Sequence, residues 1–252
     1  MTPEMAKPKL VPVDDEKRMT VLEHLEELRR VLIVSLIAWG AATVVGFLLS
    51  GFLLEHLVLL PVKSVLPAGH KVVYFTGPID KFILYFKVGI FAGFILSSPV
   101  IIWQVWTFVA PGLRRNERRF AVGFVISATF LFLMGIAFAF YAMPIALRFL
   151  TGFGNSDIVY LPLADKYVNF VLVLIAIFGV TFELPLALTL LGLAGIVKAQ
   201  TLRKRRIPIW IGIFVGANLV TPGVDPFTPL LLAAPLIILF EISILVIRFL
   251  RR

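Results

Sequence analysis

Glu183 is the residue of this sequence whose type and surroundings most clearly indicate chemistry. It lies in the stretch FGVTFELPLAL and is the one charged residue between Tyr167 and Val197. Charge near a bilayer centre costs about 2.5–3.5 kcal/mol on insertion scales, so an intramembrane acid is a functional candidate by default. The alternative is a protonated glutamate that hydrogen-bonds to a neighbouring helix. Pro185, two residues later, frees a backbone carbonyl and favours a bend beside this carboxyl group.

A second candidate site lies in the segment TVLEHLEELRRVL, at residues 20–32. Leucines recur here at helical spacing, which predicts an amphipathic helix that leads into the first apolar run. Glu26 and Arg30 have the i,i+4 spacing of an ion pair. That pairing leaves Glu27 and Arg29 without a local task. The alternative is a solvated interfacial helix that carries only surface pairs.

A third carboxylate lies in the basic segment FVAPGLRRNERR, at residues 108–119, where Glu117 is the single acid. Topology alone offers an alternative account of this segment. Asn116 would cap the following helix, Glu117 would complement the helix N-terminus, and the arginines would fix the segment on one side of a membrane.

The composition indicates a polytopic membrane protein of all-α class. Of the 252 residues, 60% are hydrophobic and 15% are charged, and the mean hydropathy is +0.98. Several runs exceed 18 residues with few charges, which is typical of membrane-spanning helices. We predict six spans, of which the fifth and sixth form a short hairpin, at residues 31–52, 82–109, 120–149, 168–197, 207–220 and 230–250. Residues 1–19 are expected to form a flexible tail, and residues 20–252 a single membrane domain.

The loop charges predict the orientation. Segments 1–30, 111–119, 198–206 and 248–252 hold 18 of the 24 Lys and Arg residues. The other six, Lys87 among them, lie in or beside the alternate loops. The positive-inside rule then places both termini in the cytoplasm. A role in nucleic-acid binding is disfavoured, because the basic residues are divided among four juxtamembrane segments.

Most enzyme classes lack support in this sequence. There is no cysteine, and the three histidines are scattered, so no clustered metal site is indicated. The zinc-protease, nucleophile-elbow, Walker A and dinucleotide motifs are also missing. We therefore predict a protein that is not an enzyme and needs no cofactor or metal.

At these same residues the sequence resembles the TatC family, the signal-peptide receptor of the twin-arginine protein translocase. The resemblance rests on HLEELRRVL, on SSPVIIWQVWTFVAPGLRRNERR, on GIAFAFYAMP, on FGVTFELPLAL and on a Thr-Pro…Asp turn before the last span. It runs from about Glu23 to Arg248, and the motifs occur in the family's order.

The resemblance assigns functional residues one by one. Signal-peptide binding falls on residues of the first and second motifs: Glu27, Arg29, Leu32, Phe108, Pro111, Leu113, Glu117, Arg118 and Arg119. The family's intramembrane polar residue falls on Glu183. A partner-binding or structural role falls on Pro61 and on the turn residues Thr221, Pro222 and Asp225.

The resemblance implies a concave, glove-like bundle of six helices, and the lack of a transit peptide in the sequence favours the inner membrane of a prokaryote over a plastid. The resemblance also implies export of folded proteins that carry paired-arginine signal peptides, driven by the protonmotive force. The implied partners are the single-span subunits TatA and, in many systems, TatB, together with membrane lipids and further copies of the chain. The competing hypothesis from the residues alone is a proton-coupled transporter of small solutes that uses Glu183.

Overall fold

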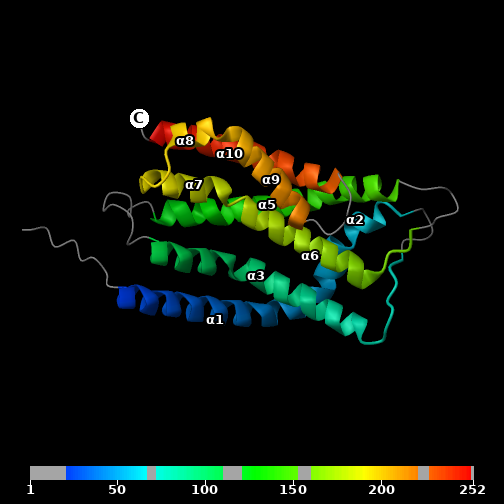
Figure 1. Ribbon diagram of the computed structural model, residues 1–252. Helices are drawn as coiled ribbons and strands as arrows, with labels where there is room; N and C mark the ends of the chain where they lie inside the picture. The colour runs from blue at the N-terminus through cyan, green and yellow to red at the C-terminus, as the bar shows by residue number, and fades with distance from the viewer. Residues whose placement is uncertain (1–20, 67–71, 110–120, 153–159, 221–226, 251–252) are drawn as a thin grey trace, which may run out of the picture.

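The structure is a computed structural model in which residues 21–66, 72–109, 121–152, 160–220 and 227–250 are described. Within these residues the secondary structure is helical apart from an isolated parallel bridge between Tyr74 and Leu163. Five helical segments are long and apolar enough to cross a membrane, and a shorter apolar helix covers Arg206–Leu219. The predicted all-α membrane fold is confirmed, and the bundle is elongated along the helix axes (Figure 1).

The first span forms a longer helical segment than its apolar run alone. Helix α1 (Val21–Leu53) continues without a break from the amphipathic stretch into the apolar one. A π-helical turn, η1 (Leu54–Val58), then leads into the short helix α2 (Leu60–Lys63). The predicted ion pair between Glu26 and Arg30 is wrong, because the two side chains form no such contact in the structure.

Helix α3 (Asp80–Val109) packs along α1 over most of its length (Figure 1). Glycine makes this close approach possible, since a Cβ atom at Gly93 would lie 2.5 Å from the Cα atom of Thr43. The indole N–H of Trp39 donates a hydrogen bond to the carbonyl of Ile90 at 3.0 Å. α1 and α3 thus form a tightly packed helix pair.

The core lies between α5 (Ala121–Thr151) and α6 (Ala164–Thr181). Met143 of α5 and Phe178 of α6 are fully buried there. The Tyr167 hydroxyl donates to the carbonyl of Val58 at 2.7 Å, which attaches α6 to η1. Burial of these large apolar side chains is the main contribution to holding α5 and α6 together.

The predicted fourth span is two helices rather than one. After α6 the chain passes through Phe182 and Glu183, and α7 (Leu184–Leu193) begins with Pro185 in its first turn. Proline lacks the amide proton that a continuous helix would use and is favoured in the first turn of a new one. The predicted bend at Pro185 is therefore a helix break that places Glu183 at its corner.

The last two helices form a hairpin, and a short helix precedes it. α8 (Ala199–Lys204) leads into α9 (Arg206–Val220), and α10 (Phe227–Leu250) packs against α7, α8 and α9. The short fifth span of the prediction corresponds to α9. Figure 1 places α8 and the C-terminal end of α7 at the same end of the bundle as the start of α1.

Candidate functional site

The first candidate site surrounds Glu27 near the start of α1. Glu27 is half-buried, whereas Glu26, Arg29 and Leu32 are exposed. One carboxylate oxygen of Glu27 is shielded from solvent and has no hydrogen-bond partner among the described residues. An open hollow of about 530 Å³ lies here and is lined by Glu23, Glu26, Glu27, Arg29, Arg30, Ile33 and Val34. The hollow thus presents three carboxylates next to two guanidinium groups.

Phe108, at the end of α3, is the second predicted residue that reaches this region. Its ring stacks on the His24 ring, with centroids 4.3 Å apart and planes 16° apart. Nδ1 of His24 lies 3.9 Å from Oε2 of Glu27. His24 therefore links the end of α3 to the carboxylate of α1. The histidines are scattered along the sequence and none was predicted to belong to this site, although His24 and Glu27 have the i,i+3 spacing of neighbours on one helix face.

Several predicted residues lie outside the described part of the chain. They are the tail at residues 1–19, the loop residues Pro111, Leu113, Glu117, Arg118 and Arg119, and the turn residues Thr221, Pro222 and Asp225. Helix α3 ends with Phe108 and Val109, directly before the 110–120 segment. This end of α3 is next to His24.

Glu183 lies at the break between α6 and α7. Its backbone carbonyl accepts hydrogen bonds from the amides of Leu186 and Ala187, at 3.0 and 2.9 Å, and so starts α7. Its Oε1 atom is shielded and has no hydrogen-bond partner among the described residues. The Thr181 hydroxyl donates instead to the carbonyl of Ile177 at 2.7 Å. The described helices therefore cover this oxygen without giving it a partner.

Pro61 lies in α2, at the opposite end of α1 from Glu27. Its side chain is buried, and its carbonyl accepts a hydrogen bond from the Ser64 hydroxyl at 2.7 Å. Of the two roles expected for Pro61, partner binding and turn structure, the burial favours the structural one.

A second acid lies within an apolar helix and was not among the predicted site residues. Glu241 lies in α10, and its Oε2 accepts a hydrogen bond from the Arg206 guanidinium at 2.6 Å. The signal was present in the sequence, because the same rule that selects Glu183 selects any carboxylate in an apolar span. Its ion pair with Arg206 gives Glu241 a structural task that Glu183 lacks.

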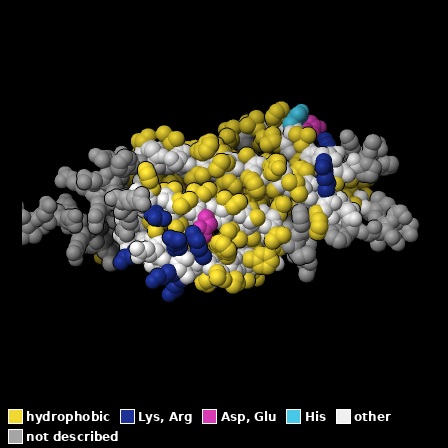
Figure 2. Space-filling view, turned by 90° about the horizontal axis from the view of Figure 1, so that it is seen from above, with side chains coloured by type: hydrophobic (Ala, Val, Ile, Leu, Met, Phe, Trp, Pro, Cys, Tyr) yellow, Lys and Arg dark blue, Asp and Glu magenta, His cyan; other side chains and the backbone are white. Residues whose placement is uncertain are grey.

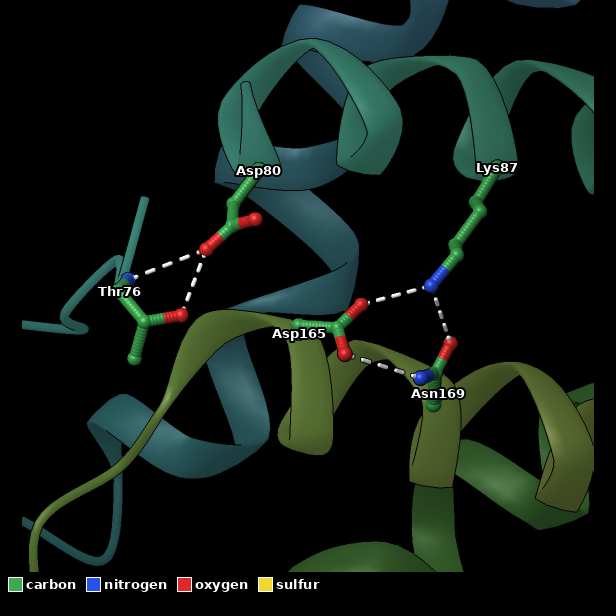
Figure 3. Close-up of polar contacts among 5 residues, drawn as sticks. All are labelled: Thr76, Asp80, Lys87, Asp165 and Asn169. Atoms are coloured by element: carbon green, nitrogen blue, oxygen red, sulfur yellow. Dashed lines mark hydrogen bonds and ion pairs between the residues drawn. The ribbon is translucent and has the colours of Figure 1, made fainter. Parts of the chain in front are cut away.

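Lys87 forms a polar cluster within the helices rather than in a loop, about two turns into α3. Figure 3 shows its ammonium group between Asp165 and Asn169 of α6. The Nζ atom donates to Asp165 at 2.6 Å and to Asn169 at 3.0 Å, and the Asn169 amide donates to the other Asp165 oxygen at 3.3 Å. Asp80 accepts hydrogen bonds from Thr76 nearby (Figure 3). The cluster fixes α3 against α6.

These features define a class of protein: a multi-pass membrane protein with a carboxylate-lined hollow at one end and an unpartnered acid at a helix break. The sequence model of the family described as Sec-independent protein translocase protein (TatC) matches residues 23–235. The chain belongs to the TatC family.

Similar proteins cover nearly the whole chain. A Sec-independent protein translocase protein TatC of Carboxydothermus hydrogenoformans is 37% identical over 94% of this chain and 96% of its own length. The TatC protein of Escherichia coli is 37% identical over 93% of this chain and 90% of its own length. A crystal structure titled as the twin arginine translocase receptor TatC superposes with a TM-score of 0.80 at 33% identity, over 91% of this chain and all of that one.

Proposed function

We propose that this chain is the core receptor of a twin-arginine translocase. It binds signal peptides with paired arginines and exports folded proteins, driven by the protonmotive force. Membership of the TatC family and the similarity to a structure titled as the translocase receptor support this function. The alternative, a solute transporter that uses Glu183, has no such support.

The receptor role requires carboxylates that accept guanidinium groups. A guanidinium group forms two parallel hydrogen bonds with a carboxylate, which lysine does not reproduce. We assign this task to Glu27 on α1 and to Glu117 in the segment that follows α3, with Arg29, Arg118 and Arg119 repelling cationic peptides that lack two good acid contacts. Leu32, Phe108, Pro111 and Leu113 would contact the apolar part of the signal peptide.

The observation that carries this assignment is the contact chain from Phe108 through His24 to Glu27. It places the start of the 110–120 segment at the turn of α1 that holds Glu27. Glu117 follows Phe108 by nine residues, which fully extended reach about 30 Å. Both carboxylates can therefore meet one signal peptide.

Glu183 is the second functional residue of the proposal. Its half-buried carboxyl group would accept a hydrogen bond from a polar residue of a partner's transmembrane helix or of a passing signal peptide. Since an unpaired polar group in a membrane is unfavourable, such a partner gains binding free energy by pairing with it.

The proposal also covers the location, the orientation and the partners of the receptor. The chain acts in the inner membrane of a prokaryote with both termini in the cytoplasm, as a transport protein and not as an enzyme. Its partners are TatA and, where present, TatB, with further copies of the chain in the complex. Thr221, Pro222 and Asp225 form a turn that contributes to partner contacts or to the hairpin of α9 and α10.

The test is a photocrosslinking experiment in membrane vesicles with the reactive side chain at Ile33, which lines the hollow. Signal peptides with Arg-Arg and with Lys-Lys are compared on the unsubstituted chain, on Glu27→Gln and on Glu117→Ala. We expect an Arg-Arg-dependent crosslink that falls about tenfold or more in each variant, because hydrogen bonds to charged groups contribute about 1.5–3 kcal/mol.

Glu55→Gln is the matched control. It removes the same charge at the other end of the first helical segment, where Glu55 is exposed in η1 and does not line the hollow. Crosslinking should remain near that of the unsubstituted chain. Equal crosslinking of the two peptides, or an equal loss in Glu55→Gln and Glu27→Gln, would contradict the receptor site at Glu27.

A further inference from the structure

A basic patch lies on α8 and the residue that follows it, apart from the Glu27 site. Arg203, Lys204 and Arg205 are consecutive and exposed, and we call them the α8 patch. None of the three side chains forms an ion pair or hydrogen bond with a described residue. Figure 2 shows Lys and Arg side chains gathered around one acidic side chain on the face seen from above. The loop charge that predicted the topology is thus also a local surface feature.

The α8 patch is held in place from both sides. Leu202 is buried and packs in one cluster with Phe240, Ile244 and Ile247 of α10. Arg206, the next residue after the patch, is paired with Glu241 at 2.6 Å. The fixed backbone on both sides turns the three intervening cationic side chains outward, and their long apolar stems let the charged ends move toward an interface.

Apolar surface begins directly beyond the α8 patch. Ile207 and Ile211 are 69% and 59% exposed, and Phe214 continues the same apolar surface along α9. In a membrane protein these side chains contact acyl chains. Trp210 lies between them, and tryptophan is enriched at the level of lipid headgroups. The surface therefore joins cationic groups to an apolar wall, which matches an amphiphile with an anionic head.

We propose that the α8 patch and the exposed face of α9 bind an anionic phospholipid. Its phosphate lies among Arg203, Lys204 and Arg205, and its acyl chains lie along Ile207, Ile211 and Phe214. A cation near an anionic membrane surface contributes about fivefold in binding. This site depends on the chain lying in a membrane and not on the receptor function proposed above.

Two other anions share part of this chemistry. Free phosphate would use the cationic groups but not the apolar wall. An acidic protein segment would need an exposed site in the aqueous phase, whereas the patch is continuous with the lipid-facing surface of α9. The continuity of charge and apolar surface favours the lipid.

The experiment uses the fluorescence of Trp210 in the full chain, with Trp39, Trp103 and Trp106 replaced by Phe. The protein is reconstituted in phosphatidylcholine vesicles that contain either brominated phosphatidylglycerol or brominated phosphatidylcholine as quencher. We expect the anionic lipid to be preferred at Trp210 by about fivefold or more. The ratio of Trp210 quenching by brominated phosphatidylglycerol to quenching by brominated phosphatidylcholine should fall to about one in the triple variant Arg203→Gln/Lys204→Gln/Arg205→Gln.

A matched triple substitution controls for net charge. Lys81→Gln/Arg148→Gln/Lys166→Gln removes the same charge at other exposed positions and should keep the preference. Equal quenching by the two lipids in the starting protein, or an equal loss in both triple variants, would overturn the proposal. So would loss of the preference on adding millimolar glycerol phosphate or an acidic peptide, since the site would then take a soluble anion.

A salt titration tests the same point if the triple variant of the patch fails to fold. The preference of the starting protein should decline as sodium chloride rises from 0.05 to 0.5 M, concentrations chosen to shorten the screening length from roughly 14 Å to 4 Å. A preference that is independent of salt would exclude the cationic patch as its source.

Discussion

The His24 ring lies against the Phe108 ring in a parallel stack, 4.3 Å between centroids, and it joins the start of α1 to the end of α3. Stacked aromatic pairs contribute about 0.5–1.5 kcal/mol beyond the area they bury. That is small for a whole protein, but it acts at the end of α3, two residues before the 110–120 segment starts. The contact therefore holds the end of α3 at the turn of α1 that carries Glu27.

Phe108→Ala should weaken signal-peptide binding without unfolding the chain. The substitution removes the ring that holds the end of α3 at His24, so the end of α3 is no longer held at the turn of α1 that carries Glu27. We expect the Arg-Arg-dependent crosslink at Ile33 to fall about threefold to tenfold. Phe108→Tyr is the control, because it keeps an aromatic ring for the stack and leaves the contact between His24 and Glu27 intact. A crosslink that survives Phe108→Ala unchanged would show that the stack does not position the loop.

Glu183→Leu should raise the thermal stability of the protein and abolish export. The described helices give Glu183 Oε1 no hydrogen-bond partner, and removing an unsatisfied buried polar group recovers about 1–3 kcal/mol. We expect thermal unfolding in detergent at a higher temperature than for the starting protein, together with loss of export in vesicles.

Glu183→Gln provides the comparison for that result. It keeps a hydrogen-bonding side chain of the same shape, so it should keep partner contacts if only polarity matters. A less stable Glu183→Leu protein would show instead that Glu183 is held by contacts within the fold, which is the structural alternative stated from the sequence.

The helices were predictable because their signal is local. Runs of apolar residues of membrane-spanning length gave the long helices, and α9 matches the short fifth span to within one residue at its start. The break at Glu183 was anticipated only as a bend, since proline is compatible with both a kinked helix and a new helix start. Which one forms depends on packing around Phe182, which is buried and lies 5.6 Å from Phe138 between ring centroids.

The candidate site was only partly predictable because its contacts are non-local. The motifs named Glu27 and Phe108, but no spacing rule connects positions so far apart to one histidine. The same limit applies to Glu241, whose partner Arg206 lies on another helix. Pairing across helices follows from how α1, α3, α9 and α10 pack, and that arrangement is not encoded in any one segment.

Lys87→Met should destabilise the fold more than loss of a surface ion pair would. The Lys87 and Asp165 side chains are 34% and 40% exposed, but the Lys87 ammonium donates to both Asp165 and Asn169, so its removal leaves two acceptors without their donor. We expect a loss of about 1.5–3 kcal/mol, measured by thermal unfolding in detergent. The double variant Lys87→Met/Asp165→Leu should recover part of that loss. If the two single losses simply add, the two groups do not interact.

Gly93→Ala should separate α1 from α3. A Cβ atom at this position would lie 2.5 Å from the Cα atom and 2.6 Å from the backbone nitrogen of Thr43, distances that real Cβ atoms do not adopt. The obstacle is backbone, so the helices themselves must move apart, which costs about 1–3 kcal/mol for an overpacked core. We expect lower thermal stability in detergent and, because α3 carries Phe108, a weaker Arg-Arg-dependent crosslink at Ile33.

Gly40→Ala is the matched control on α1. A Cβ atom there would have no neighbour within 4 Å, so it adds no clash. Alanine in place of glycine within a helix is favourable by about 1 kcal/mol, and Gly40→Ala should leave stability unchanged or raise it. A Gly93→Ala protein as stable as Gly40→Ala would mean that the α1–α3 contact is looser than this packing. The end of α3 would then have to be held near Glu27 by the His24 stack alone.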